Sequence, residues 1–255
     1  MASDRRTFLI GAGALVAATA CSGSDEAADP AAPTTTTTSP RSTTTAPAGL
    51  DPLTPAMFAA LSICAIPPAS AAGPFPTDEQ LERRDITEGY DGHPLRLGVR
   101  VVDDACRPLE GVAVEIWHTD ATGDYSSYDD GGDGKDEGEG TTFLRGFQTS
   151  DVDGILEFQT IYPGWYPNRA VHIHARLRVA GELVLTTQLY FDEDYTDRVF
   201  AEAPYAEFGS PRTGWATDVL IDDPTVDGSG ITLTPAETAL GRGTLGLVNL
   251  GVSVP

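Results

Sequence analysis

The chain has 255 residues, of which 40% are hydrophobic, and a formal net charge of −22. This length allows one globular domain with an ordinary core. The acidic balance argues against nucleic acid or anionic lipid as a partner, because binding of phosphates needs clustered Lys and Arg.

Residues 1–21 are typical of an export signal. They read "MASDRRTFLIGAGALVAATAC", in which Arg5 and Arg6 precede a short apolar run, and they resemble a twin-arginine signal. The run is shorter than the roughly 20 apolar residues of a membrane-spanning helix. Because "ATAC" resembles a lipoprotein cleavage box, we expect lipidation of Cys21; the alternatives are plain cleavage or a retained signal anchor. The predicted location is extracytoplasmic, either secreted or anchored by Cys21 at the outer face of the cell membrane.

Residues 22–49 form a linker rich in Thr and Pro. They include almost no apolar side chain larger than Ala, so this segment cannot build a core and is expected to be disordered and extended. The folded domain is expected to occupy residues 50–255. It begins with a short helix in "LTPAMFAALS", with Thr54 as N-cap and Pro55 as the first helical residue.

Six later segments show the alternation of apolar and polar residues, or the enrichment in β-branched and aromatic residues, that is typical of strands. They are residues 95–103, 112–120, 142–151, 155–163, 170–179 and 183–191. Turn signals such as Asp153-Gly154 separate them. This spacing predicts an all-β domain with an antiparallel β-sandwich core and little helix.

Residues 129–140, "DDGGDGKDEGEG", form an acidic, glycine-rich loop that invites comparison with a calcium-binding loop. Gly131 and Gly140 stand at the third and twelfth positions, where oxygen ligands belong. We interpret the segment as a solvated loop, and the sequence assigns it no further role.

Two cysteines, Cys64 and Cys106, remain once Cys21 is assigned to the signal. An oxidising compartment favours a disulfide between them. In the chain-entropy model this bond would stabilise the fold by about 3 to 4 kcal/mol. The alternative is two buried free thiols.

The segment "AVHIHARLRV" carries two histidines in a predicted strand. Side chains alternate along a strand, so His172 and His174 project together while Val171 and Ile173 pack the other way. The pair could clamp a metal ion, or it could be a strand edge with two solvated or hydrogen-bonded histidines.

Two histidines lie upstream of this pair. His118 follows Trp117 in a predicted core strand and is interpreted as structural, whereas His93 lies in a turn region and is expected to be solvated. If His172 and His174 bind a metal ion, the other ligands must therefore be carboxylate or phenolate oxygens.

Several motifs carry a family resemblance. "GVAVEIWHTDATGDYSSY", "TFLRGFQTSDVDGILEFQTIYPGWYPNRAVHIHARL" and "LTTQLYF" resemble the successive core motifs of the intradiol ring-cleavage dioxygenases, the group that includes catechol and protocatechuate 3,4-dioxygenases. The resemblance runs from about Cys64 to Phe191 and includes "GPFP". It is specific because the motifs occur in the same order with the same separations. The export signal, the linker and the domain cysteines resemble a secreted branch of that family.

The resemblance implies a non-haem Fe(III) held by two tyrosinates and two histidines. The matching positions are Tyr125, Tyr166, His172 and His174. Ferric iron is a hard, highly charged ion, so phenolate oxygens suit it. Tyr162 and Tyr128 fall outside the motif positions and are expected to be packing residues.

The resemblance also implies an activity, the cleavage of a small aromatic diol by O2 between its two hydroxylated carbons, giving a cis,cis-muconate-type diacid. Tyr166 would take a substrate proton, and Arg169 would stabilise negative charge on the ring. Gln188 would lie next to the substrate. The simpler alternatives are a surface ion pair for Arg169 and a strand hydrogen bond for Gln188.

Other interpretations stay open. An exported, non-catalytic β-sandwich could bind an aromatic or carbohydrate polymer. A two-histidine, one-carboxylate Fe(II) oxygenase would need an acidic ligand, for which we find no motif. The sequence does not rank catechol, hydroxyquinol, protocatechuate or lignin-derived catechols as substrates. The helical segment through which the catechol branch dimerises has no counterpart, so the oligomeric state is open.

Overall fold

The structure of the protein is a computed structural model. The residues that it describes are 50–61, 67, 69–70, 72–73, 76–77, 81–127, 140–208, 212–221 and 230–253. All of them belong to one compact unit, Thr43–Pro255. The predicted export signal and linker lie outside the described residues.

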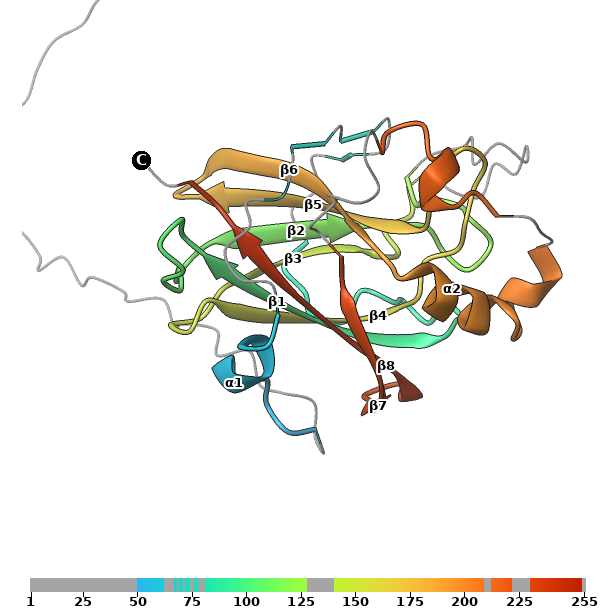
Figure 1. Cartoon of the computed structure of the whole chain (residues 1–255), viewed down its shortest axis with the longest axis horizontal. Coiled ribbons are helices and arrows are strands. Elements are labelled where there is room, and N and C mark those ends of the chain that lie inside the picture. Colours follow the sequence, from blue (N-terminus) through green and yellow to red (C-terminus); the bar gives the residue numbers. More distant parts are fainter. Residues whose placement is uncertain are drawn as a thin grey trace, which may run out of the picture. The chain divides into compact units, whose positions relative to one another are not determined.

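Two four-stranded sheets form a β-sandwich (Figure 1). The first sheet has the order β4-β1-β8-β7, with β1 (Pro94–Val102), β4 (Ile155–Ile161), β7 (Thr232–Thr238) and β8 (Gly241–Gly251). The second has the order β3-β2-β5-β6, with β2 (Ala113–Trp117), β3 (Arg145–Thr149), β5 (His172–Val179) and β6 (Glu182–Tyr190). Strands β1 and β8 pair in parallel, and the other neighbours pair antiparallel. The predicted all-β sandwich is confirmed.

Helix is scarce among the described residues. Helix α1 (Pro55–Phe58) precedes the first strand and helix α2 (Glu193–Phe200) follows β6, while Tyr205–Phe208 and Trp215–Thr217 form single 3-10 turns. No helix in the described part of the chain is both long enough and apolar enough to cross a membrane.

The core lies between the two sheets. Leu97 and Val99 of β1 join Ile173, Ala175 and Leu177 of β5 in one buried apolar cluster. Since strand side chains alternate, the residues between these positions point away from the core. The predicted alternation in β5 is therefore confirmed, and it places the two histidines of that strand on the outer face of the second sheet.

Helix α1 covers the outer face of the first sheet, with Phe58 fully buried in a second apolar cluster that also contains Leu247. A Cβ at Gly98 of β1 would lie 2.6 Å from a methyl of Leu53 and 3.2 Å from the ring of Phe58. The glycine thus gives α1 room to approach the sheet. Thr54 occupies the N-cap as predicted, although its side chain makes no capping bond.

Strands β7 and β8 and helix α2 were not predicted. Strand β8 contains several glycines, which weaken the pattern of a strand. At Gly243 a Cβ would overlap the carbonyl oxygen of Pro94 on β1. Gly243 weakens the strand pattern of β8 in the sequence, and the same glycine allows β8 to lie against β1.

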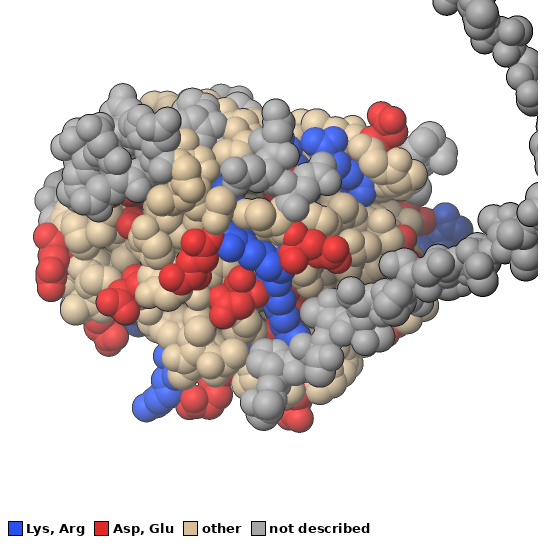
Figure 2. All heavy atoms as spheres, turned by 180° about the vertical axis from the view of Figure 1, so that it is seen from behind, with Lys and Arg blue, Asp and Glu red and all other residues tan. Residues whose placement is uncertain are grey.

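Cys106 is disulfide-bonded. Cys64, its predicted partner, lies outside the described residues, as do Cys21 and nearly all of the acidic loop at 129–140. On the face drawn in Figure 2, acidic side chains surround a smaller number of basic ones. The charge of that face is therefore mixed.

Candidate metal centre

Tyr125 and three side chains from residues 166–174 bring their polar atoms together. Tyr125 Oη lies 3.0 Å from His174 Nε2, 3.5 Å from His172 Nε2 and 3.4 Å from Tyr166 Oη. Tyr166 Oη lies 3.2 Å from His172 Nε2, and the two Nε2 atoms are 3.1 Å apart. The four residues that the family resemblance pointed to thus converge at one place.

Strand β5 supplies both histidines, and its alternation puts them side by side on the outer face of the second sheet. Across β2, the ring of Trp117 stacks on His174 with its plane tilted by 2° and the centroids 4.9 Å apart. The Arg176 guanidinium lies 4.9 Å from the centroid of the same indole ring. The orientation of His174 is therefore set by its strand and by this stack.

The two tyrosines come from loops that touch through their backbones. The loop after β2 carries Tyr125, and the loop after β4 carries Tyr166. Gly164 N donates to Asp120 O at 2.8 Å, and a Cβ at Gly164 would overlap that same oxygen. A Cβ at Gly123, whose φ is +94°, would overlap the carbonyl oxygen of Trp165. Close contact of these loops, which brings the tyrosines together, therefore depends on glycine on both sides.

Buried Arg145 of β3 fixes the loop of Tyr125. Its Nε donates to Ser126 Oγ and its Nη2 to Ser126 O, both at 2.7 Å. Ser126 Oγ in turn donates to Phe143 O at 2.7 Å. Arg145 therefore holds the residue next to Tyr125 by both its side chain and its backbone.

The imidazoles are neutral in the folded protein. Burial lowers the pKa of His172 to about 3 and the pKa of His174 well below its ordinary value. His172 Nδ1 donates to Ala170 O at 2.6 Å, which leaves the Nε2 lone pair turned toward the centre. A neutral imidazole with its Nδ1 bonded to a carbonyl is the usual form of a metal-binding histidine.

The phenols differ in burial. Tyr125 is 4% exposed and Tyr166 is half-buried. Burial raises the pKa of Tyr125 well above its ordinary value, with a lesser contribution from Tyr166, while Arg169 and Arg145 lower it. Burial also raises the pKa of Tyr166, and hydrogen bonds from Tyr125 and Arg169 oppose that rise. Both phenols thus need a strong positive charge nearby to ionise at neutral pH.

The donor set fits a hard, highly charged metal ion. Two phenol oxygens and two imidazole nitrogens, all within 3.5 Å of a neighbour in the set, would supply two negative charges to such an ion. Nowhere in the described part of the chain do three or more His, Cys, Asp and Glu side chains gather as a metal site. The two-histidine, one-carboxylate alternative therefore has no acidic ligand among those residues.

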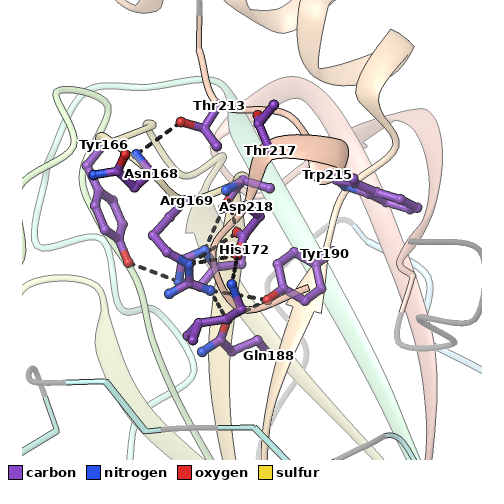
Figure 3. Close-up of polar contacts among 12 residues, drawn as sticks. Tyr166, Asn168, Arg169, His172, Gln188, Tyr190, Thr213, Trp215, Thr217 and Asp218 are labelled. Atoms are coloured by element: carbon purple, nitrogen blue, oxygen red, sulfur yellow. Dashed lines mark hydrogen bonds and ion pairs between the residues drawn. The ribbon is translucent and has the colours of Figure 1, made fainter. Parts of the chain in front are cut away.

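Arg169 and Gln188 lie beside this centre (Figure 3). Both are buried, and Arg169 Nη2 donates to Gln188 Oε1. Arg169 also hydrogen-bonds the Tyr166 phenol. Gln188, on β6, is the strand partner of His174. The alternative of a surface ion pair for Arg169 does not hold, because the guanidinium is buried and hydrogen-bonds the tyrosine.

The sequence reasoning missed two residues of this network. Tyr190 Oη donates to Gln188 Oε1 at 2.7 Å and accepts from Arg169 Nη2 at 3.1 Å. Asp218 forms an ion pair with Arg169 at 3.1 Å. Tyr190 could have been predicted from strand alternation, because it is two residues after Gln188 on the same strand and so points to the same face. Asp218 had no such signal, because it lies in an irregular segment without periodicity.

His118 and Tyr162 are structural. His118 is fully buried between Thr119 O at 2.7 Å and Thr160 Oγ1 at 2.8 Å, which agrees with its predicted structural role. Tyr162 is also fully buried and bonds Thr196 Oγ1 at 2.8 Å, as expected for a packing residue. Tyr128 lies outside the described residues.

The prediction that His93 is solvated was wrong. Its ring is half-buried, Nε2 bonds Thr244 Oγ1 at 2.8 Å, and its backbone N–H donates to Tyr205 Oη at 3.0 Å. Thr244 belongs to β8, which the sequence analysis did not predict. The strand that covers His93 was therefore missing from the sequence-based expectation.

Known proteins resemble this chain over the same region. A family model described as dioxygenase matches residues 67–225. Catechol 1,2-dioxygenase from Acinetobacter baylyi is 31% identical over 170 residues, which are 57% of this chain and 53% of that protein. Intradiol ring-cleavage dioxygenase hqdA from Aspergillus niger is 29% identical over 143 residues, 48% of this chain and 41% of that protein. The chain thus spans about half the length of the curated relatives it matches.

The fold also has a solved counterpart. An intradiol ring-cleavage dioxygenase from Tetranychus urticae superposes with a TM-score of 0.66 and 29% sequence identity, covering 74% of this chain and 95% of that one. The likeness therefore covers most of this chain and nearly all of the solved chain.

Proposed function

The chain belongs to the intradiol ring-cleavage dioxygenase family, and we propose that it cleaves a catechol-type aromatic with O2 between the two hydroxylated carbons, giving a cis,cis-muconate-type diacid. The metal would be Fe(III), held by Tyr125, Tyr166, His172 and His174. The observation that carries this proposal is the convergence of their four donor atoms, each of which lies 3.0 to 3.5 Å from at least two of the others.

When bound, ferric iron supplies a Lewis-acidic centre that takes both oxygens of a catechol as anions and makes the ring carbons reactive toward O2. The diol would then lose two protons, one to a hydroxide ion and the other to a side chain of the protein. Tyr166 is the half-buried member of the set, and its Oη lies beside Arg169, so its phenolate oxygen is placed to take one substrate proton. Tyr125 is buried and would remain a ligand of the metal ion when the substrate binds.

Arg169 and Gln188 would act on the substrate ring. The guanidinium carries a fixed positive charge in a buried setting, where it stabilises developing negative charge more strongly than in water. Gln188 Oε1 accepts from both Arg169 and Tyr190, so its amide is fixed beside the same site. Together these residues would orient the ring and stabilise its negative charge.

The proposal also covers location. An exported protein, with Cys21 lipidated and residues 22–49 as a spacer, would present this domain outside the cytoplasm. The Cys106 disulfide supports an oxidising compartment.

Oxygen uptake by the iron-loaded full chain tests this proposal. Catechol, hydroxyquinol and protocatechuate are offered in turn, and the expected result is consumption of one O2 per diol, with both ¹⁸O atoms recovered in a diacid by mass spectrometry. His172→Ala should abolish uptake. A non-catalytic binding module would consume no oxygen with any of the three diols, and that outcome would reject the proposal.

A further inference from the structure

Asp218 is a buried carboxylate that several groups contact at once (Figure 3). Its side chain has no exposed surface. Its two oxygens accept from Arg169 Nε at 3.2 and 3.1 Å, and it also accepts from the backbone N–H of Ala170 at 2.6 Å and of Leu220 at 2.7 Å. A buried carboxylate is costly unless it is paired and hydrogen-bonded, and this one is both.

The segment that carries Asp218, residues 212–221, is attached to the turn before β5. Val219 N donates to Asn168 O at 3.2 Å, and Asn168 N donates to Thr213 Oγ1 at 3.0 Å. At its other side, Trp215 N donates to Glu193 Oε1 of α2 at 2.9 Å. The carboxylate of Asp218 is therefore held in place from two elements.

The Arg169 guanidinium is divided between two tasks. Its Nε edge faces Asp218, and its Nη2 atom donates to Gln188 Oε1 and to Tyr190 Oη. A guanidinium is planar and its donors have fixed directions. The bond from Nε to Asp218 therefore sets the direction in which Nη2 points.

Asp218 also reaches one of the histidines through a single residue. It accepts from Ala170 N, and Ala170 O accepts the Nδ1 proton of His172 at 2.6 Å. The residue that orients the His172 ring is thus held by the same carboxylate that holds Arg169.

We propose that Asp218 is a positioning residue that fixes both Arg169 and Ala170, and through them the direction of the guanidinium and of the His172 ring. This inference rests on the proposed ring cleavage. Within the described part of the chain, the hydrogen bonds of Asp218 go to Arg169, Ala170 and Leu220 and to none of the four converging side chains, so it acts through Arg169 and Ala170. A small misplacement of such groups lowers the rate of the chemical step more than it lowers binding.

The test compares Asp218→Asn with Asp197→Asn in the iron-loaded full chain. The control removes another carboxylate that pairs with an arginine, since Asp197 contacts Arg212 at 2.8 Å and is 68% exposed. Asp218→Asn should lower kcat by about 10- to 100-fold with a change of less than about 3-fold in the anaerobic dissociation constant for catechol. The control should change neither quantity, and Asp218→Glu should recover part of the lost kcat. Equal kcat in Asp218→Asn and wild type would overturn the inference.

Two further readouts separate positioning from a general loss of structure. If Asp218 acts through Arg169, the double variant Asp218→Asn/Arg169→Met should have about the same kcat as Arg169→Met alone. A double variant whose loss of kcat is the product of the two single losses would contradict this.

In the iron-free protein, hydrogen exchange of the Ala170 amide should be faster in Asp218→Asn and unchanged in Asp197→Asn. Unchanged exchange at Ala170 would likewise overturn the inference. Wild-type protein that consumes no O2 with any diol would instead reject the proposed function, and the exchange result would still report on Asp218.

Discussion

Each tyrosine of the candidate metal centre has a buried arginine nearby. Arg169 and, to a lesser extent, Arg145 lower the pKa of Tyr125, and Arg169 lowers the pKa of Tyr166, in both cases against the larger effect of burial. The phenols are therefore protonated in the metal-free protein, and a bound cation is needed to ionise them. Arg145 also holds the Tyr125 loop through Ser126, so one residue gives both charge and position.

His118 makes the folded protein sensitive to acid. Burial lowers its pKa from 6.5 to about 4, so the unfolded chain binds a proton at a pH where the folded chain does not. The buried neutral imidazole of His118 contributes fully to stability above pH 6.5, and this contribution is lost as the pH falls from 6.5 to about 4. In this window the free energy of unfolding should fall by about 1.4 kcal/mol per pH unit for each such histidine.

The measurement is thermal or urea unfolding of the iron-free protein between pH 7 and 5.5. His118→Gln keeps an amide that can bond Thr119 O and Thr160 Oγ1, and it should reduce the pH slope of stability by about one proton. His93, His172 and His174 contribute to the remaining slope, because burial lowers their pKa values too. A variant with the same slope as the wild type would show that His118 is not neutral in the folded state.

Two irregular loops, rather than strands, set the positions of the two phenol oxygens of the candidate metal centre. The loops after β2 and β4 carry the tyrosines, and they approach each other at Gly123 and Gly164. A Cβ at Gly164 would overlap Asp120 O and lie 2.7 Å from the carbonyl carbon of Ala121. These contacts are backbone on backbone, so neither loop can yield by a change of side-chain rotamer.

Gly164→Ala should therefore push the two loops apart. We expect iron affinity to fall by about 10- to 100-fold and the free energy of unfolding by about 1 to 3 kcal/mol. Gly230→Ala is the matched control, since nothing lies within 4 Å of a Cβ there. Iron titration and thermal unfolding of both variants check this expectation, and wild-type iron affinity in Gly164→Ala would contradict it.

The strands show what could be predicted from the sequence. Alternation predicted β1, β2, β4, β5 and β6 and the outward direction of His172 and His174, because each of these strands has apolar residues in the core. Strand β3 has none there and was predicted from its β-branched and aromatic residues. Strand β8 was missed because glycines such as Gly243 interrupt its apolar pattern. Gly243 is needed for the close contact of β8 with β1. Asp218 was missed because its partners, Arg169 and Ala170, are distant in the sequence and no period links them.

For the whole molecule, the candidate centre and the core lie on opposite faces of one sheet. The side chains of Ile173 and Ala175 fill the space between the sheets, whereas His172 and His174 project outward to meet the two tyrosine loops. The sandwich can thus keep its core while the outer face binds a metal ion. Loss of a phenol oxygen at Tyr125 or Tyr166 should accordingly alter the centre without removing the fold.

The most direct test of the account is the visible absorption of the ferric protein. Wild-type protein loaded with Fe(III) should be red to burgundy, because electron density moves from tyrosinate to iron on absorption of light. Tyr125→Phe and Tyr166→Phe should each shift or weaken the band, and the double variant should lose it. Tyr162→Phe, which removes a buried phenol bonded to Thr196, should leave the band unchanged. A colourless ferric protein, or a band that survives the double substitution, would contradict the assignment of Tyr125 and Tyr166 as iron ligands.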